Sequence, residues 1–194
     1  MTVLYLIVAR GGSKRLPGKN LKEIQGISLV GYKCLAAKKA KSCSLAMIST
    51  DSPQIADVAR QYGVTVPFIR PAELATDEAT TEDVVRHAMA WCEDGHAVFD
   101  AIHLLEPSSP FVSPHEYDAA VKMMDDETDF VCGNVLYLFR WTYLKSRKDL
   151  YDNLVKNKDF HLSQNHEIDI DTWDDFRFAE LVVEDEEIDL SWAQ

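Results

Sequence analysis

Short apolar runs alternate along this chain with longer segments in which apolar residues recur every three or four positions. The runs LYLIVA and AIHLL show no regular polar alternation, which is typical of strands buried on both faces of a sheet. The longer segments have the period of helices that bury one face. The pattern predicts strands over Thr2–Ala9, Ser44–Thr50, Val64–Ile69, Phe99–Leu105, Asp129–Cys132 and Asn134–Phe139, and helices over Ser28–Ala40, Pro53–Tyr62, Thr81–Asp94, Pro114–Met124, Trp141–Asn153 and Thr172–Val183.

The alternation of strands with helices predicts an α/β fold with a mostly parallel sheet. With 194 residues, 46% of them hydrophobic, the chain can bury one continuous core, so we expect a single domain over residues 1–194. We expect the acidic tail, about residues 184–194, to be exposed to solvent. In sheets of this kind, ligands bind outside the carboxyl ends of the strands. The functional loops are therefore expected after Ala9, Thr50, Ile69, Leu105 and Phe139.

Charge and composition limit the classes of ligand and the location expected for the protein. The formal net charge of −12 argues against nucleic acid as the main ligand, because phosphate backbones bind basic surfaces. The longest apolar stretch, Val3–Ala9, is too short to cross a membrane and lacks the pattern of a signal peptide. We therefore expect no membrane association and a cytoplasmic location. Four cysteines without C-x-x-C spacing predict reduced thiols rather than zinc ligands or disulfides.

A cluster of cations interrupts this acidic sequence immediately after the first predicted strand. In ARGGSKRLPGKN, the side chains of Arg10, Lys14, Arg15 and Lys19 fall within ten residues. The glycine pair lets the backbone N–H groups approach a ligand, and the Pro-Gly pair bends the loop so that Lys19 can return toward it. The spacing is neither that of a Walker P-loop nor G-x-G-x-x-G. The loop predicts a site for a small polyanion such as a triphosphate; the alternative is a solvated basic turn.

The segment ARGGSKRLPGKNL resembles the signature loop of the CMP-sialic acid synthetase (acylneuraminate cytidylyltransferase) family. The likeness continues in family order through ISTDSPQIADVARQYGV, RPAELATDEATTEDVVRHAM, LLEPSSPF and IDIDTWDDFRFAE, which together span most of the chain. The resemblance implies a Rossmann-like, three-layer nucleotidyltransferase fold. It also implies that CMP is transferred from CTP to the anomeric hydroxyl of an acidic keto-acid sugar, with Mg²⁺ as cofactor and release of pyrophosphate.

The resemblance also implies roles for individual residues. The CTP-binding residues that it implies are Ala9, Arg10, Gly11, Gly12, Ser13, Lys14, Lys19, Asn20, Arg70, Ala79 and Thr81. On the sugar side it implies Glu106, Pro107, Ser108 and Tyr137, and as metal ligands Asp169 and Asp171. Pyrophosphate release depends mainly on positioning and on neutralising charge. The catalytic candidates are therefore Arg10, Lys14, Lys19 and Asp171.

The chemistry of the segment IDID agrees with the implied metal site. Carboxylates at positions i and i+2 of an extended segment, here Asp169 and Asp171, project to the same side. Oxygen ligands without His or Cys suit Mg²⁺ better than zinc. The alternative is an acidic cap for the helix that begins in DTWDD. The four other motifs in family order favour the metal interpretation.

The residues implied to read the base have structural alternatives as well. Arg70 could pair with Glu73 on the surface, although Pro71 and the strand end before it favour a fixed position. Thr81 could cap the helix predicted to begin there, which is compatible with a place at the edge of a ligand.

Two features depart from the family pattern and concern the sugar side. The family usually carries Gln at the position of Glu106, and a carboxylate there would repel an acidic sugar unless it were protonated or paired. The family also has a long insertion between the two strands that correspond to DFVC and NVLYLF, which forms the dimerisation arm and brings basic residues to the partner's sugar site. This chain lacks that insertion, although Tyr137 retains the tyrosine of the family. A homodimer is therefore possible but would lack its usual arm.

Two classes of function follow. The first is a Mg²⁺-dependent cytidylyltransferase for a nonulosonic or related keto-acid sugar, or for a different sugar if Glu106 accepts hydrogen bonds from hydroxyl or amine groups. The second is a nucleotide-binding protein without catalytic activity that acts as a sensor or as the partner of a true synthetase. The second predicts CTP binding without pyrophosphate release.

Overall fold

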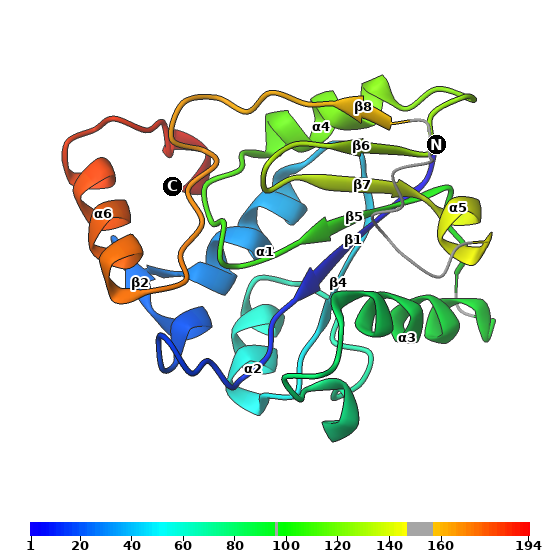
Figure 1. The fold of residues 1–194 in the computed structure, drawn as a ribbon, viewed down its shortest axis with the longest axis horizontal. Coiled ribbons are helices and arrows are strands. Elements are labelled where there is room, and N and C mark those ends of the chain that lie inside the picture. The colour runs from blue at the N-terminus through cyan, green and yellow to red at the C-terminus, as the bar shows by residue number, and fades with distance from the viewer. Residues whose placement is uncertain (96, 147–156) are drawn as a thin grey trace.

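A six-stranded sheet forms the centre of the protein, which we describe from a computed structural model over residues 1–95, 97–146 and 157–194 (Figure 1). Every strand of this sheet runs in the same direction except β7, which is antiparallel to both neighbours. The predicted α/β fold with a mostly parallel sheet is therefore confirmed. The strand order is β4 (Cys43–Ser49), β1 (Val3–Val8), β5 (Ala101–Leu105), β7 (Tyr137–Arg140), β6 (Phe130–Cys132) and β8 (Asn157–Asp159).

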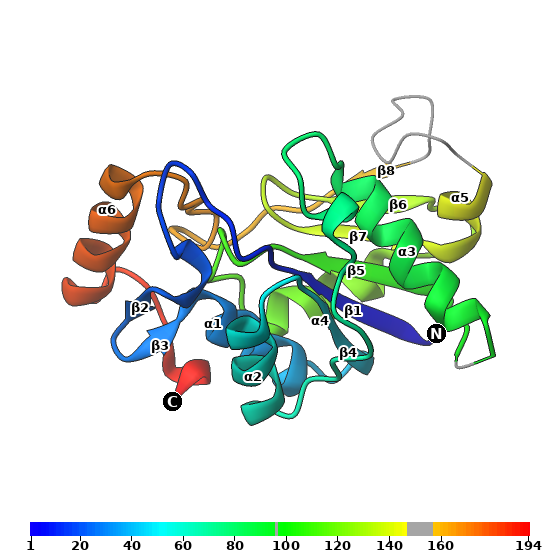
Figure 2. The same ribbon diagram turned by 90° about the horizontal axis from the view of Figure 1, so that it is seen from below.

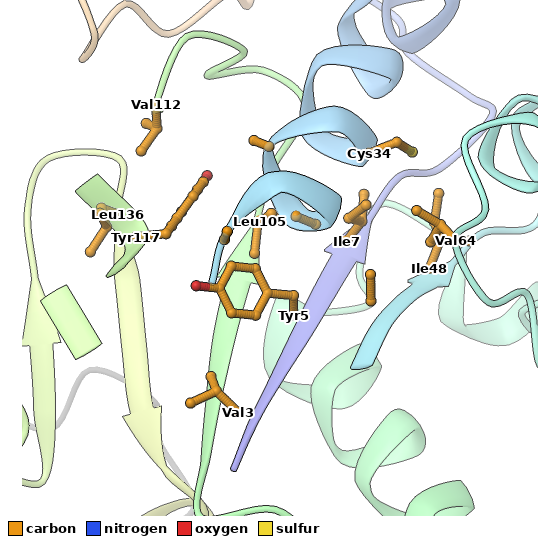
Figure 3. Close-up of a cluster of buried hydrophobic side chains, with 14 of the residues drawn as sticks. Val3, Tyr5, Ile7, Cys34, Ile48, Val64, Leu105, Val112, Tyr117 and Leu136 are labelled. Atoms are coloured by element: carbon orange, nitrogen blue, oxygen red, sulfur yellow. The ribbon is translucent and has the colours of Figure 1, made fainter. Parts of the chain in front are cut away.

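Helices cover both faces of the sheet and make the three layers (Figure 2). Side chains of Val3, Tyr5 and Ile7 on β1 pack on one face (Figure 3), against α1, α2 and α4, whereas Leu4 and Leu6 pack on the other face. Because β1 is buried on both faces, its sequence shows no polar alternation. The helices on the first face are α1 (Leu29–Lys39), α2 (Pro53–Gln61) and α4 (Pro114–Met123), and those on the second are α3 (Thr81–Glu93) and α5 (Trp141–Ser146).

The helix α6 (Trp173–Glu184) lies beyond the carboxyl ends of β1 and β5, at the left of Figure 1. It packs with the short hairpin of β2 (Glu23–Ile24) and β3 (Ile27–Ser28) in a separate apolar cluster. The turn of this hairpin uses Gln25 and Gly26, both with positive φ. This arrangement brings the segment that precedes α6 next to the cationic loop.

Several boundaries differ from the predicted ones. The segment predicted as a strand over Val64–Ile69 is not one: Thr65 forms a single parallel bridge to Met47, and Pro67 offers no N–H to continue the pairing. The loop after Phe139 lies at the opposite edge of the sheet, because β7 runs antiparallel and only its start faces the other functional loops. Of the helix predicted over Trp141–Asn153, α5 confirms the first part, and residues 147–153 lie outside the described residues.

The acidic tail was only partly predicted correctly. Residues 184–187 are exposed, but Ser191–Ala193 forms a short 3-10 helix that docks on α1. There the Lys39 ammonium donates hydrogen bonds to the carbonyl oxygens of Trp192 (2.6 Å) and Gln194 (2.9 Å). In the described parts of the chain, no helix has the length and apolar character needed to cross a membrane.

Candidate active site

A cleft of about 640 Å³ opens at the carboxyl ends of β1 and β5, which is where ligands bind in mostly parallel sheets. Most of the residues implied by the sequence line it, including the cationic loop, Arg70 and Glu106. Ala9, Gly11, Tyr137 and Asp169 are not among the residues that line it. The complete lining is Val8, Arg10, Gly12, Ser13, Lys14, Arg15, Lys19, Asn20, Arg70, Leu74, Thr76, Asp77, Ala79, Thr80, Thr81, Val84, Glu106, Pro107, Ser108 and Asp171.

The first cations of the loop face an acidic residue that the sequence did not single out. Arg10 donates to the Asp77 carboxylate (2.9 Å), and Lys14 forms an ion pair with the other oxygen of the same carboxylate. The hydrogen bond from Lys14, followed by that from Arg10, lowers the pKa of Asp77. These side chains are well exposed, with 83% of Lys14 accessible, and exposed ion pairs contribute little to stability. A polyanion can therefore displace Asp77 at small cost.

The later cations of the loop converge on Asp171. Lys19 donates to an oxygen of Asp171 (2.9 Å) and to the carbonyl of Ile170 (2.9 Å), and Arg15 donates to the second oxygen (2.5 Å). The Lys19 side chain is only 14% exposed. The hydrogen bond from Lys19 is the main cause of the lowered pKa of Asp171. Asp171 is thus an ionised carboxylate held between two cations at the cleft wall.

The two glycines of the loop have different environments. The Gly11 N–H already donates to the Asp51 carboxylate (2.8 Å), so the expectation that both glycines offer their N–H groups to a ligand is wrong at Gly11. A Cβ at Gly11 would lie 3.0 Å from the Cβ of Ser52, which explains the need for glycine there. Gly12 lines the cleft, and a Cβ there would meet no atom within 4 Å.

Arg70 is buried and fixed on the strand end of β4. It is only 6% exposed, and its guanidinium donates to the Ser49 hydroxyl (3.0 Å) and the Ser49 carbonyl (2.6 Å). Burial lowers its pKa to about 10, opposed in part by the charge of Asp51. The expectation that Arg70 has a fixed position is therefore confirmed. Its guanidinium bonds to Ser49, and not to Glu73 as in the alternative interpretation. Asn20, also buried, holds the loop by donating to the carbonyl of Arg10 (2.9 Å).

The start of α3 forms the wall beside Arg70. Thr80, not Thr81, caps this helix: its hydroxyl accepts from the N–H of Asp83 (3.1 Å), and the Asp83 carboxylate accepts from the N–H of Thr80 (3.0 Å). The capping alternative for Thr81 is therefore wrong by one residue. As the first helical residue, Thr81 lines the cleft beside Ala79, and the helix N-terminus adds its partial positive charge.

The far end of the cleft lies at the turn that follows β5. The backbone carbonyl of Ser108 accepts a hydrogen bond from the N–H of Ile170 (2.7 Å). This bond joins the turn to the segment that carries the two aspartates. The buried Ile170 belongs to the apolar cluster around α6, and Asp169 and Asp171, which flank it outside any strand, are more exposed. Asp169 accepts from the Ser109 hydroxyl (3.3 Å). Asp171 lines the cleft and Asp169 does not, so a metal site shared by the two carboxylates stays a prediction.

Glu106 and Tyr137 lie in the same acidic region. Burial raises the pKa of Glu106 and the charge of Asp169 raises it further, against the opposing effects of Lys33 and Lys19. Burial likewise raises the pKa of Tyr137, and its hydroxyl donates to the carbonyl of Asn134 (2.9 Å).

A tight hairpin connects β6 to β7. The Gly133 N–H donates to the carbonyl of Leu136 (2.8 Å), and the two strands pair directly from Cys132 with Tyr137 to Phe130 with Phe139. A Cβ at Gly133 would lie 2.7 Å from the carbonyl oxygen of Phe160. The chain therefore passes from β6 to β7 through residues 133–136 alone.

Asp77 and Arg15 are the charged residues of the cleft lining that sequence reasoning did not assign to the site. Arg15 belongs to the quoted cation cluster, so its position in the loop was the available signal. Asp77 lies in the quoted segment RPAELATDEATTEDVVRHAM, but nothing indicated its pairing with Arg10 and Lys14, which lie more than sixty residues away in the chain.

The chain resembles known proteins in sequence over most of its length. The sequence matches the cytidylyltransferase family over residues 4–188. A CMP-N,N'-diacetyllegionaminic acid synthase from Legionella pneumophila is 42% identical over 123 residues, which are 63% of this chain and 53% of that protein. The post-translational flagellin modification protein B of Campylobacter coli is 33% identical over 158 residues, 81% of this chain and 64% of that protein. The chain thus matches between half and two thirds of the length of these relatives.

Two solved structures share the fold. A CMP:2-keto-3-deoxy-manno-octonic acid synthetase solved with CTP superposes with a TM-score of 0.79 at 15% identity, covering 96% of this chain and all of that one. A Mycobacterium tuberculosis protein solved with manganese superposes with a TM-score of 0.66 at 14% identity, covering 93% and 99%. At these identities the likeness establishes the three-layer fold.

Proposed function

Because this chain belongs to the cytidylyltransferase family, we propose that it binds CTP in the cleft and transfers CMP to an acidic sugar, releasing pyrophosphate. One observation carries the proposal most strongly. A protein of net charge −12 places four cations of one loop, together with the buried Arg70, along a single cleft. Such a local reversal of charge suits a triphosphate.

The phosphates of CTP would bind along the cationic loop. Lys14 and Arg10 would leave Asp77 for the phosphates, since their exposed pairs are easily replaced. Lys19 is preorganised by its two hydrogen bonds and would supply a fixed positive charge where the bond to the leaving pyrophosphate breaks. The sugar hydroxyl would attack the α-phosphorus and give up its proton to water, and the electron pair of the broken P–O bond would leave with pyrophosphate.

Arg70 and the start of α3 would read the base. The guanidinium carries only donors, and cytosine offers acceptors at O2 and N3, whereas uracil carries a hydrogen at N3. Because Arg70 is buried and held by Ser49, it cannot easily turn away from a mismatched base. A fixed donor of this kind discriminates well against a ligand that leaves it unpaired.

The chemistry of Asp169 and Asp171 fits a divalent cation. Both carry carboxylate oxygens, which Mg²⁺ prefers. The exposed Arg15 would have to leave its oxygen of Asp171 for the metal to bind there. Among the described residues no three His, Cys, Asp or Glu side chains gather as a metal site, so CTP phosphates and water would complete the ligand set. A bound metal would neutralise phosphate charge in the transition state. The manganese of the structural neighbour supports a divalent metal, and Mg²⁺ is our assignment.

The acceptor would bind beside Glu106, Pro107, Ser108 and Tyr137. The synthase names of the relatives support a nonulosonic sugar acid as its class. A homodimer and a cytoplasmic location stay predictions.

Pyrophosphate release tests this function. The protein is incubated with CTP and Mg²⁺ and with a panel of nonulosonic acids, other keto-acid sugars and neutral sugars. Release with an acidic sugar supports the transferase, and its CMP-sugar product is identified by mass spectrometry. CTP binding without release from any acceptor would support the non-catalytic alternative.

A further inference from the structure

One carboxylate joins the two sides of the cleft. Asp77 lies on the segment between Pro71 and the start of α3, and it binds two cations of the loop that follows β1. One of its oxygens accepts from Arg10 (2.9 Å), and the other forms an ion pair with Lys14. Arg10 also donates to the backbone carbonyl of Thr76 (3.3 Å). Arg10, Lys14, Thr76 and Asp77 all line the cleft, so these two cations already hold an anion within it.

The carboxylate of Asp77 has no other anchor in the fold. Among the described residues, only Arg10 and Lys14 donate to it, and its side chain is 46% exposed. By contrast, the carboxylate of Asp83 accepts from both the N–H and the hydroxyl of Thr80. A group that positions other side chains must itself be held in place. The cations therefore hold Asp77, and Asp77 has no anchor with which to position them.

The contacts of Asp77 resemble those that a phosphate group would make. The hydrogen bonds from Lys14 and Arg10 lower the pKa of Asp77, so the carboxylate is ionised at neutral pH. It presents two oxygens to two cations, as a phosphate can. A phosphate and Asp77 cannot both stay on Arg10 and Lys14, because two anions at one place repel each other. Phosphate binding at these cations therefore requires that Asp77 leaves.

We propose that Asp77 is an internal competitor of the phosphates, which occupies Arg10 and Lys14 in the free protein and so lowers the affinity of the cleft for a nucleotide. The inference rests on the proposed function only for the identity of the ligand as a nucleoside triphosphate. Because exposed ion pairs are weak, a triphosphate with its several negative charges displaces the single charge of Asp77. Loss of that charge should leave both cations available and tighten binding.

Calorimetric titration of Asp77→Asn with CTP and with inorganic tripolyphosphate, both with Mg²⁺ present, tests the proposal. The substitution keeps the size of the side chain and removes its charge. Both ligands should bind about three- to tenfold more tightly than to the wild type, because two weak pairs no longer have to be broken.

Glu78→Gln is the matched control. Glu78 is the next residue along the chain, is exposed and does not line the cleft, so the same change in net charge should leave both affinities nearly unchanged. Weaker binding by Asp77→Asn would show that the carboxylate positions the cations, and equal tightening in Glu78→Gln would show a general effect of net charge. Either result, or an unchanged affinity of Asp77→Asn, would overturn the proposal.

The titration with tripolyphosphate separates this inference from the proposed function, since it needs neither base nor sugar. Tighter tripolyphosphate binding by Asp77→Asn would support the competitor even if the wild type neither preferred CTP nor released pyrophosphate, in which case the proposed function alone would fail. CTP selectivity and pyrophosphate release in the wild type, with no tightening in Asp77→Asn, would overturn the competitor and leave the proposed function standing.

Discussion

Lys19→Met is the substitution that probes the nucleotide half of the site most directly. The Lys19 ammonium makes two hydrogen bonds of 2.9 Å, to Asp171 and to the carbonyl of Ile170, and its side chain is 14% exposed. Charge-assisted bonds to phosphate contribute roughly 1.5–3 kcal/mol each, so its loss should weaken CTP binding about 10- to 100-fold. Calorimetric titration of CTP with Mg²⁺ present measures this change.

The same substitution has a cost in stability that can be measured separately. Asp171 keeps Arg15 as a partner and is partly exposed, so we expect a loss of about 1–2 kcal/mol, or roughly 2–8 °C in Tm. Lys14 is 83% exposed, and Lys14→Met should weaken CTP binding without lowering Tm. Lys122→Met, which removes an exposed lysine outside the cleft, serves as the control for net charge. A folded Lys19→Met protein that binds CTP as tightly as the Lys122→Met control would refute the reasoning.

Two further predictions concern residues that hold the scaffold. Burial opposes ionisation of Glu116, but hydrogen bonds from His166 and from two backbone N–H groups outweigh it and lower the pKa of Glu116 to about 2. Its stabilisation is therefore complete above the unfolded pKa of about 4.3 and is lost as the pH falls toward 2. Glu116→Gln should lower Tm at neutral pH, and a deficit in thermal scans that does not shrink below about pH 4 would contradict this. Gly11→Ala should lower Tm by about 2–4 °C through contact with Ser52, whereas Gly12→Ala should not; equal values for the two variants would count against the packing argument.

The parts of the fold that depend on local sequence were predictable. The buried strands show as apolar runs, and the cationic loop is contiguous, so its place at the carboxyl end of β1 followed from the fold class. Arg70 could be placed because Pro71 and the end of an apolar segment restrict it. The metal role of the aspartates of IDID stays a prediction, since Asp171 alone of the two lines the cleft.

The parts that depend on pairing between distant segments were not predictable. Whether Val64–Ile69 joins the sheet is decided by the edge of β4 and by Pro67, and periodicity cannot show this. Asp77 reaches the cationic loop through the fold alone. Lys33 belongs to a helix that is buried on nearly every side, so nothing in its spacing distinguishes it from the exposed Lys38.

The central claim is that the cleft selects CTP, and calorimetric titration with CTP, UTP, ATP and GTP in the presence of Mg²⁺ tests it most directly. We expect saturable binding of CTP, with each other nucleotide bound at least about tenfold more weakly, because the guanidinium of Arg70, fixed by Ser49, would face acceptors in cytosine. Binding of UTP or a purine nucleotide as tightly as CTP would contradict the roles of Arg70 and Thr81, and with them the proposed function.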